Sequence, residues 1–173
     1  MHTCCAICAA GLVQALKDRF FITLFFYNPN IQPKAEYARR KGATEKLASY
    51  FGLDFEEGEY QPDVWLSLVK GYGKEPEAGQ RCLICFRDRL TKTAELAKKE
   101  QADFFTSTLL ASHQKNEQAI IILGQVIGQE QGVNFASLAD LGLDKKALAI
   151  SARKISQELG LYRQKYCGCI FSK

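Results

Sequence analysis

The chain has 173 residues, enough for one domain with a substantial core, and its 47% hydrophobic and 24% charged residues exclude a disordered or fibrous protein. Its net charge of +4 is compatible with an anionic partner such as RNA but does not require one. No apolar run approaches the roughly 20 residues of a membrane-spanning helix, and the N-terminus lacks the basic and apolar regions of a secretory signal. We therefore expect a cytoplasmic protein.

Strand-like and helical segments alternate along the chain. The run FFITLFFY has the continuous apolar character of a strand buried on both faces, and Gly52 and Gly132 each follow a helical segment. In chain order the sequence predicts a helix over 9–19, a strand over 20–27, a helix over 33–51, a strand over 53–60, helices over 63–70 and 86–100, a strand followed by a polar turn over 102–110, a helix over 112–132, a strand over 133–138 and a helix over 144–159. This order predicts a single α/β domain over residues 1–173, with a mainly parallel sheet and helices on both faces.

Three short segments follow predicted strands and carry polar or thiol side chains. They are residues 4–8, which follow a first strand that is absent or very short, the Asn-Pro-Asn turn at 28–30, and the Thr-Ser-Thr turn at 106–108. Ligands of such sheets bind beyond the carboxyl ends of the strands. We therefore expect the three segments to contribute to one site.

The seven cysteines fall into three tight groups, with none elsewhere. They form a CCxxC group, a CxxC group and a CxC group: Cys4, Cys5 and Cys8; Cys82 and Cys85; Cys167 and Cys169. An odd number of cysteines in a reducing compartment is a poor basis for a disulfide framework. A lone cysteine is most often a small buried hydrophobe, but this grouping favours metal coordination.

The spacing alone leaves several thiol functions open. Four thiolates suit either a structural zinc ion or an iron-sulfur cluster. A single site of this kind leaves three cysteines for a second metal with an open position, which would be a catalytic arrangement. A thioredoxin-like exchange at Cys82 and Cys85 is a third possibility, because a CxxC pair lowers a thiol pKa.

Other polar residues near these groups have both structural and functional interpretations. His2 is a possible ligand or proton donor. His113 is predicted at a helix start, where Ser112 has the character of an N-cap. The basic residues that could contact phosphates or offset thiolate charge are Arg39, Arg40 and Lys41 on a helix and Arg163 and Lys165 in the tail.

Five segments together resemble the QueH-type epoxyqueuosine reductases. They are HTCCAIC, FFYNPNIQPKAEYARR, EPEAGQRCLICFRDRLTKTAELA, DFFTSTLLASHQKN and LYRQKYCGCIFS, which together span nearly the whole chain. The resemblance implies removal of the epoxide oxygen of epoxyqueuosine in tRNA, the last step of queuosine formation. It also implies a fold similar to the nucleotide α-hydrolase (HUP) superfamily, whose ATP-pyrophosphatase members carry an SGGxDS phosphate loop that is missing from this sequence.

The resemblance further implies two metal sites, a [4Fe-4S] cluster and an adjacent single metal ion, expected to be iron. The implied cluster ligands are Cys5, Cys82, Cys85 and Cys167, and the implied ligands of the lone metal are Cys4, Cys8 and Cys169. The C-terminal tail, residues 160–173, is expected to close the metal site. The expected partners are the tRNA anticodon loop and an electron donor protein or reductant, and the candidate proton donors are Tyr162, Tyr166, His113 and His2.

A non-catalytic zinc-binding module that contacts tRNA or a protein is the alternative, and a tRNA-thiolating enzyme is disfavoured by the missing phosphate loop. Two departures from the family pattern are visible. Ile7 stands where members commonly have proline, and residues 136–144 lack the arginine that many members carry before the last helix.

Overall fold

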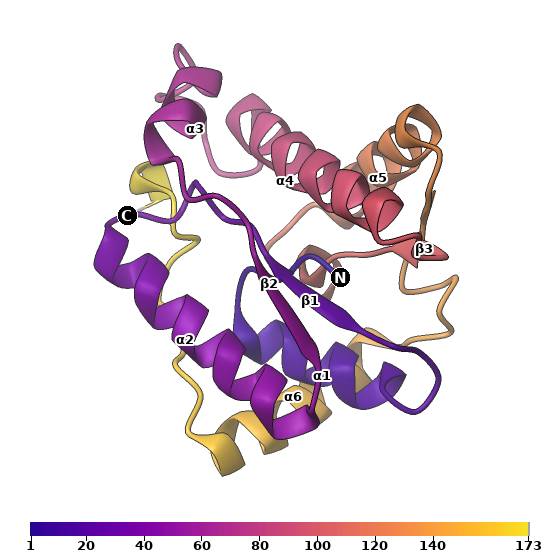
Figure 1. Ribbon diagram of the computed structural model, residues 1–173. Coiled ribbons are helices and arrows are strands. Elements are labelled where there is room, and N and C mark those ends of the chain that lie inside the picture. The colour runs from indigo at the N-terminus through magenta and orange to yellow at the C-terminus, as the bar shows by residue number, and fades with distance from the viewer. Residues whose placement is uncertain (173) are drawn as a thin grey trace.

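The computed structural model describes residues 1–172 as a small α/β domain (Figure 1). The helices are α1 (Ala6–Leu16), α2 (Lys34–Phe51), α3 (Pro62–Leu68), α4 (Gln80–Lys99), α5 (Glu117–Gln131) and α6 (Lys145–Leu159), with short 3-10 helices at Thr108–Ala111 and Ile170–Ser172. The strands are β1 (Thr23–Phe26), β2 (Asp54–Glu57), β3 (Phe104–Phe105) and β4 (Asn134–Phe135). Each predicted helix and strand is present, with boundaries that differ by up to six residues. The largest difference is at α4, which begins at Gln80 rather than at residue 86 and so includes Cys82 and Cys85. No helix in this part of the chain is long and apolar enough to cross a membrane.

The strands form two parallel pairs that the N-terminal residues join. β1 pairs with β2, and β3 pairs with β4. His2 makes parallel bridges both to Phe25 of β1 and to Ser107, just after β3. The backbone NH of Phe25 also donates to the carbonyl of Met1 at 2.8 Å. Residues 1–3 thus occupy the position of a very short central strand, so the carboxyl ends of three neighbouring chain segments meet at one edge.

Helices cover both sides of the β1–β2 pair, with α1 and α2 on one side and α4 on the other (Figure 1). Leu12 of α1 packs in one core cluster with Leu90 of α4 and Ile120 of α5. A second cluster joins α1, α6, Leu24 of β1 and Leu47 of α2. Because α1 contributes to both clusters, its first turn is held firmly against the sheet.

The packing of α1 against α6 depends on Gly11. A Cβ atom at Gly11 would overlap the carbonyl oxygen of Leu148 and would lie 3.3 Å from the Cβ of Ala152. The missing side chain therefore lets the two helices approach closely. This contact fixes the helix whose N-terminal end carries the first cysteine group.

The segment predicted as a strand followed by a polar turn over 102–110 is a strand only as far as Phe105. The side-chain oxygen of Ser107 accepts a hydrogen bond from the backbone NH of Leu109 at 3.1 Å, and a 3-10 helix begins at Thr108. Local hydrogen bonding of this kind competes with strand pairing. The strand is therefore short, and the chain turns back at the edge where the strands end.

The start of α5 differs from the prediction. Asn116, rather than Ser112, is the N-cap, and its side-chain oxygen accepts from the NH of Ala119 at 3.0 Å. The assignment of Ser112 as a cap of this helix was therefore wrong. His113 lies in a turn before the helix instead of at its first position.

Candidate metal centre

The N-terminal cysteine group lies where residues 1–3 end and α1 begins. Cys5 is the N-cap of α1, and its sulfur accepts from the NH of Cys8 at 3.5 Å. The backbone NH of Cys4 donates to the side-chain oxygen of Thr108 at 3.2 Å, and the Cys4 sulfur lies 3.6 Å from the same oxygen. Cys5 is buried, while Cys4 and Cys8 are half-buried. Backbone contacts with the sheet and α1 therefore place this group.

The second cysteine group lies in the first turns of α4. The sulfur of Cys82 accepts from the backbone NH of Ala78 at 3.3 Å. Cys85 is buried in a small apolar cluster with Trp65 and with Cys169 of the tail. Burial raises the pKa of the Cys85 thiol to about 12, so this thiol is protonated at neutral pH in the metal-free protein.

The third cysteine group comes from the tail. Lys115, in the turn before α5, lies with its ammonium nitrogen 3.2 Å from the sulfur of Cys167. The same ammonium pairs with Glu77 at 2.5 Å. Burial tends to lower the pKa of Lys115, but Cys167 and Glu77 oppose this and raise it above its usual value. Burial also raises the pKa of the Cys169 thiol.

Arg89 of α4 connects the three groups. The side chain is buried, with 2% of the residue exposed, and burial alone would lower its pKa. The thiols of Cys85, Cys4 and Cys167 act in the opposite direction and raise that pKa, so one residue from each group lies within electrostatic reach of Arg89. Its Nη2 atom is buried and has no hydrogen-bond partner among the described residues. A buried cation in this state is complementary to negative charge on the surrounding sulfurs.

The seven thiols are all free, but they do not form a finished ligand set. Within residues 1–172, no three side chains of histidine, cysteine, aspartate or glutamate are arranged to hold a metal ion. Metal binding would therefore require rotation of the thiols and loss of their protons. The donor chemistry still fits a thiolate-bound centre, because one thiol from each of the three groups lies within electrostatic reach of Arg89, whose buried Nη2 has no hydrogen-bond partner among the described residues.

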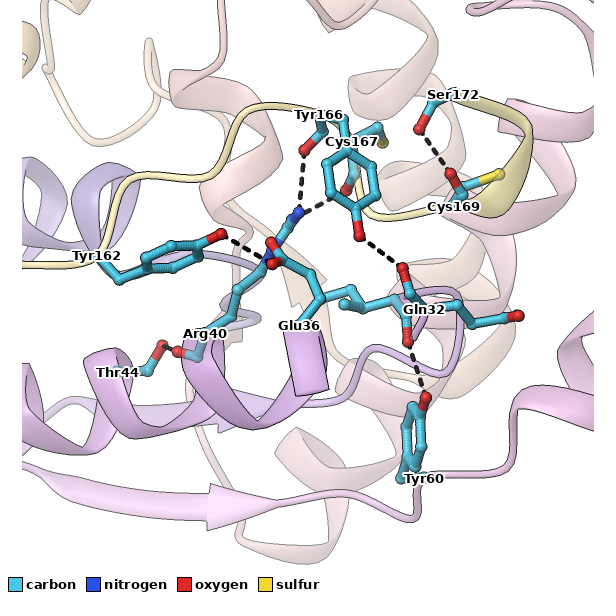
Figure 2. A network of polar contacts seen from close by, with 11 residues as sticks. Gln32, Glu36, Arg40, Thr44, Tyr60, Tyr162, Tyr166, Cys167, Cys169 and Ser172 are labelled. Carbon is cyan, nitrogen blue, oxygen red and sulfur yellow. Dashed lines mark hydrogen bonds and ion pairs between the residues drawn. The ribbon is translucent and has the colours of Figure 1, made fainter. Parts of the chain in front are cut away.

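The predicted proton donors occupy different environments. Tyr162 donates its hydroxyl to Glu36 at 2.8 Å, and Tyr166 donates its hydroxyl to the carbonyl of Gln32 at 2.6 Å (Figure 2). Both tyrosines thus help to attach the tail. His113 is exposed, two positions before the lysine that contacts Cys167.

His2 is completely buried at the junction of the strands. Its Nδ1 lies 2.8 Å from the side-chain oxygen of Ser107, and its Nε2 lies 3.2 Å from the carbonyl of Tyr27. Burial, followed by the nearby charge of Arg89, lowers the pKa of His2 well below its usual value. The ring is therefore neutral at physiological pH and holds the sheet together.

Comparison with known proteins decides the family. The family model described as epoxyqueuosine reductase QueH matches residues 1–173. The chain belongs to the QueH family. Among its relatives, the protein named epoxyqueuosine reductase QueH from Thermotoga maritima is 38% identical over 175 residues, covering 99% of this chain and 88% of the relative. Its namesakes from Streptococcus pyogenes serotype M1 and Dehalococcoides mccartyi are each 35% identical, covering 99% and 100% of this chain and 69% and 91% of the relatives.

In this QueH-family chain, the cations beside the thiols are not the ones that the sequence suggested. Arg40 is buried and faces the backbone of the tail, so its assignment as a phosphate contact was wrong. Arg163 and Lys165 are exposed, whereas Arg89 and Lys115 lie beside the thiols. A sequence signal existed for Arg89, because it follows Cys85 by one helical turn on the apolar stripe of α4.

Proposed function

We propose that this chain reduces epoxyqueuosine in tRNA to queuosine, the last step of queuosine formation. The reaction consumes two electrons and two protons, replaces the epoxide by a carbon–carbon double bond and releases the epoxide oxygen as water. The observation that carries the proposal is the gathering of free thiols from all three cysteine groups around Arg89, in a chain of the QueH family. The same arrangement supports the assignment as an iron-sulfur oxidoreductase.

The proposed cofactors are a [4Fe-4S] cluster and one further metal ion, expected to be iron. Following the family resemblance, the cluster ligands are Cys5, Cys82, Cys85 and Cys167, and the ligands of the second ion are Cys4, Cys8 and Cys169. The structure suggests one alternative, in which Cys4 is a cluster ligand and Cys5 binds the second ion. The reason is that Cys4, Cys85 and Cys167 all lie close enough to Arg89 to raise its pKa. When bound, these groups would supply single electrons and a Lewis acid.

The chain's own residues contribute charge, desolvation and a proton. Arg89 and Lys115 offset negative charge on the thiolates, and the buried setting of Arg89 strengthens this effect by excluding water. Among the candidate acids, His113 is favoured because it is exposed and lies two positions before the lysine that contacts Cys167. Tyr162 and Tyr166 remain candidates, although both hydroxyls already donate to acceptors in α2 or just before it. A positioned acid of this kind would protonate the departing oxygen.

The proposed substrate is the anticodon loop of a tRNA with an unstacked modified base. The phosphates of the tRNA would be contacted by exposed basic residues, Arg163 and Lys165 in the tail and Arg39 on α2. An electron donor protein or small reductant would supply the electrons. Because the substrate is tRNA, we place the reaction in the cytoplasm. The parallel strands and covering helices are compatible with the proposed likeness to the nucleotide α-hydrolase fold.

The test is a single-turnover assay under anaerobic conditions. Metal-loaded protein is mixed with a reduced one-electron donor and tRNA that contains epoxyqueuosine, and the modified nucleosides are separated by mass. The proposal predicts conversion to queuosine by the wild type and loss of conversion in Cys85→Ser. Failure of iron-loaded wild-type protein to form product would contradict it, and a colourless protein with one zinc ion would favour the non-catalytic module.

A further inference from the structure

An ion pair on α2 is almost completely buried. Arg40 Nε lies 2.7 Å from Glu36 Oε1, and the two side chains are only 2% and 5% exposed. An ion pair at this spacing on a helix is usually exposed and stabilises the protein by a few tenths of a kcal/mol. Burial of both charges adds a desolvation penalty that the pair alone does not reliably offset. The stability of this buried pair therefore depends on the partners of its remaining hydrogen-bonding groups.

Those remaining groups all bind the C-terminal tail. Arg40 Nη1 donates to the carbonyl of Cys167 and Nη2 donates to the carbonyl of Tyr166, both at 3.0 Å. Glu36 Oε2 accepts from the hydroxyl of Tyr162 at 2.8 Å. Figure 2 shows all three bonds, with the Cys167 carbonyl directed at Arg40 while its sulfur lies on the other side of the tail. The pair and the tail lie more than 120 residues apart in sequence, so this is a tertiary attachment.

At Gly168, the backbone of the tail adopts a conformation that allows this close approach to Arg40. The φ of Gly168, +111°, is unfavourable for residues with a side chain, and a Cβ atom there would lie 2.9 Å from Ile31 Cγ1 and 3.2 Å from Arg40 Nη1. The NH of Gln32 donates to the Gly168 carbonyl at 2.8 Å. The turn between Cys167 and Cys169 therefore lies directly against the residues before α2 and the guanidinium.

We propose that the Glu36–Arg40 pair is a positioning device that holds Cys167 and Cys169 at the metal centre. Residues 161–169 contain no helix or strand, so secondary structure does not fix these two thiols. The planar guanidinium binds two successive carbonyls, which a lysine ammonium cannot reproduce with the same geometry. The inference rests on the proposed function only in taking the two thiols as metal ligands.

The first test measures thiol reactivity in metal-free, reduced protein. Each cysteine is labelled with a maleimide, and its labelling rate is followed by peptide mass spectrometry in wild type, Arg40→Lys and the matched control Arg39→Lys. Loss of charge-assisted hydrogen bonds predicts that Arg40→Lys labels Cys167 and Cys169 about tenfold faster or more. Cys5 and Cys8 at the start of α1 should label at the wild-type rate, because their backbone hydrogen bonds do not involve the tail. Arg39→Lys should match wild type, because Arg39 is exposed and its cation–π contact with the Tyr162 ring can also be made by a lysine ammonium.

The second test measures iron per chain after anaerobic loading. Arg40→Lys should retain less iron than wild type, whereas Arg39→Lys should retain the same amount. Tyr162→Phe provides a milder variant in case Arg40→Lys does not fold, because it removes one bond to Glu36 and leaves the ion pair intact. It should accelerate labelling of Cys167 severalfold, an effect that loss of a proton donor would not produce.

The outcomes separate the two proposals. Unchanged labelling of Cys167 and Cys169 in both Arg40→Lys and Tyr162→Phe would overturn the positioning role, even if both variants lost activity. A wild-type protein that binds no iron would overturn the proposed function, while the labelling rates would still decide whether the pair holds the tail. Faster labelling at all seven cysteines would indicate general unfolding and would also overturn the specific role.

Discussion

The cysteines at the two ends of the chain reach the same centre by different means. Cys4, Cys5 and Cys8 lie between a sheet segment and the first turn of α1, so backbone hydrogen bonds and helix packing place them. Cys167 and Cys169 lie in the part of the tail, residues 161–169, that contains no helix or strand, and α2 and the turn before it provide the attachment. The N-terminal group should therefore tolerate loss of single side-chain contacts, and the C-terminal group should not.

The largest expected effect comes from removing the tail. A chain that ends before Tyr166 lacks Cys169 and also Cys167, the proposed fourth ligand of the cluster, and should therefore lose the cluster. Iron per chain after anaerobic loading measures this directly. A chain that ends at Cys169 keeps all seven thiols and should retain most of its iron. Full iron content in the shorter chain would contradict the role assigned to the tail.

A smaller change in the same region is Gly168→Ala. The added Cβ combines an unfavourable φ with close contacts to Ile31 and Arg40, and we expect a loss of about 1–3 kcal/mol in the free energy of unfolding and severalfold less iron. Gly160→Ala is the matched control, since Gly160 also has a positive φ, of +57°, but no neighbouring atom within 4 Å of the added Cβ. Denaturant unfolding and iron analysis distinguish the two. Equal iron retention in both variants would contradict the claim that the close contacts at Gly168 position Cys167 and Cys169.

Arg89→Met tests the buried arginine that lies within electrostatic reach of cysteines from both ends of the chain. In metal-free protein, the variant should unfold at the same or higher denaturant concentration, because it removes a buried and incompletely hydrogen-bonded cation, with a gain of up to about 1–4 kcal/mol. In loaded protein, the centre should bind more weakly and have a more negative reduction potential. Arg87→Met, at an exposed position on the same helix, should change neither property. An unchanged potential in Arg89→Met would contradict the electrostatic role of Arg89.

Thr108→Val tests the tolerance of the N-terminal group. The change removes the oxygen that accepts from the NH of Cys4 and should reduce the free energy of unfolding by about 1 kcal/mol. Iron content should stay near the wild-type value, because the central strand and α1 still hold this group. If Thr108→Val lost as much iron as Gly168→Ala, the predicted difference between the N-terminal and C-terminal cysteine groups would be wrong.

Asp140→Asn should have the smallest effect, since Asp140 lies on the surface away from the cysteines. Hydrogen bonds from the side chain and backbone NH of Ser137 lower the pKa of Asp140 below its usual 3.8. This group therefore stabilises the protein above the unfolded-state pKa and loses that effect as the pH falls through the lower folded-state pKa. The difference in melting temperature between wild type and variant should be greatest near neutral pH and should shrink as the pH falls below 3.8. A constant difference would show that the charge is not responsible.

Local patterns were sufficient to predict most of the fold. The apolar run at β1, the helical stripe of α4 and the glycines after α2 and α5 each specify one element, and alternation of the elements predicted parallel pairing. The polar turn after β3 was also predicted, and there the side chain of Ser107 accepts from the backbone NH of Leu109. The exception was the start of α5, where Asn116 caps the helix later than Ser112 would have done.

The candidate site was only partly visible in the sequence. Cysteine spacing predicted three local groups of thiols, and the structure places one thiol from each group within electrostatic reach of Arg89. The supporting charges could not be predicted in this way, since Arg40 reaches Cys167 across 127 positions and Lys115 reaches it across 52. A basic run on a helix gives no sign of which arginine is buried, so Arg40 was grouped with its exposed neighbour Arg39.

The central claim is that the three cysteine groups form one iron-containing centre. Its most direct measurement is the metal content and Mössbauer spectrum of the wild-type protein, purified and loaded with iron under anaerobic conditions. The account predicts about five irons per chain, with four in the spectrum of a [4Fe-4S] cluster and one in a separate site. One tightly bound zinc ion with no cluster spectrum would contradict it.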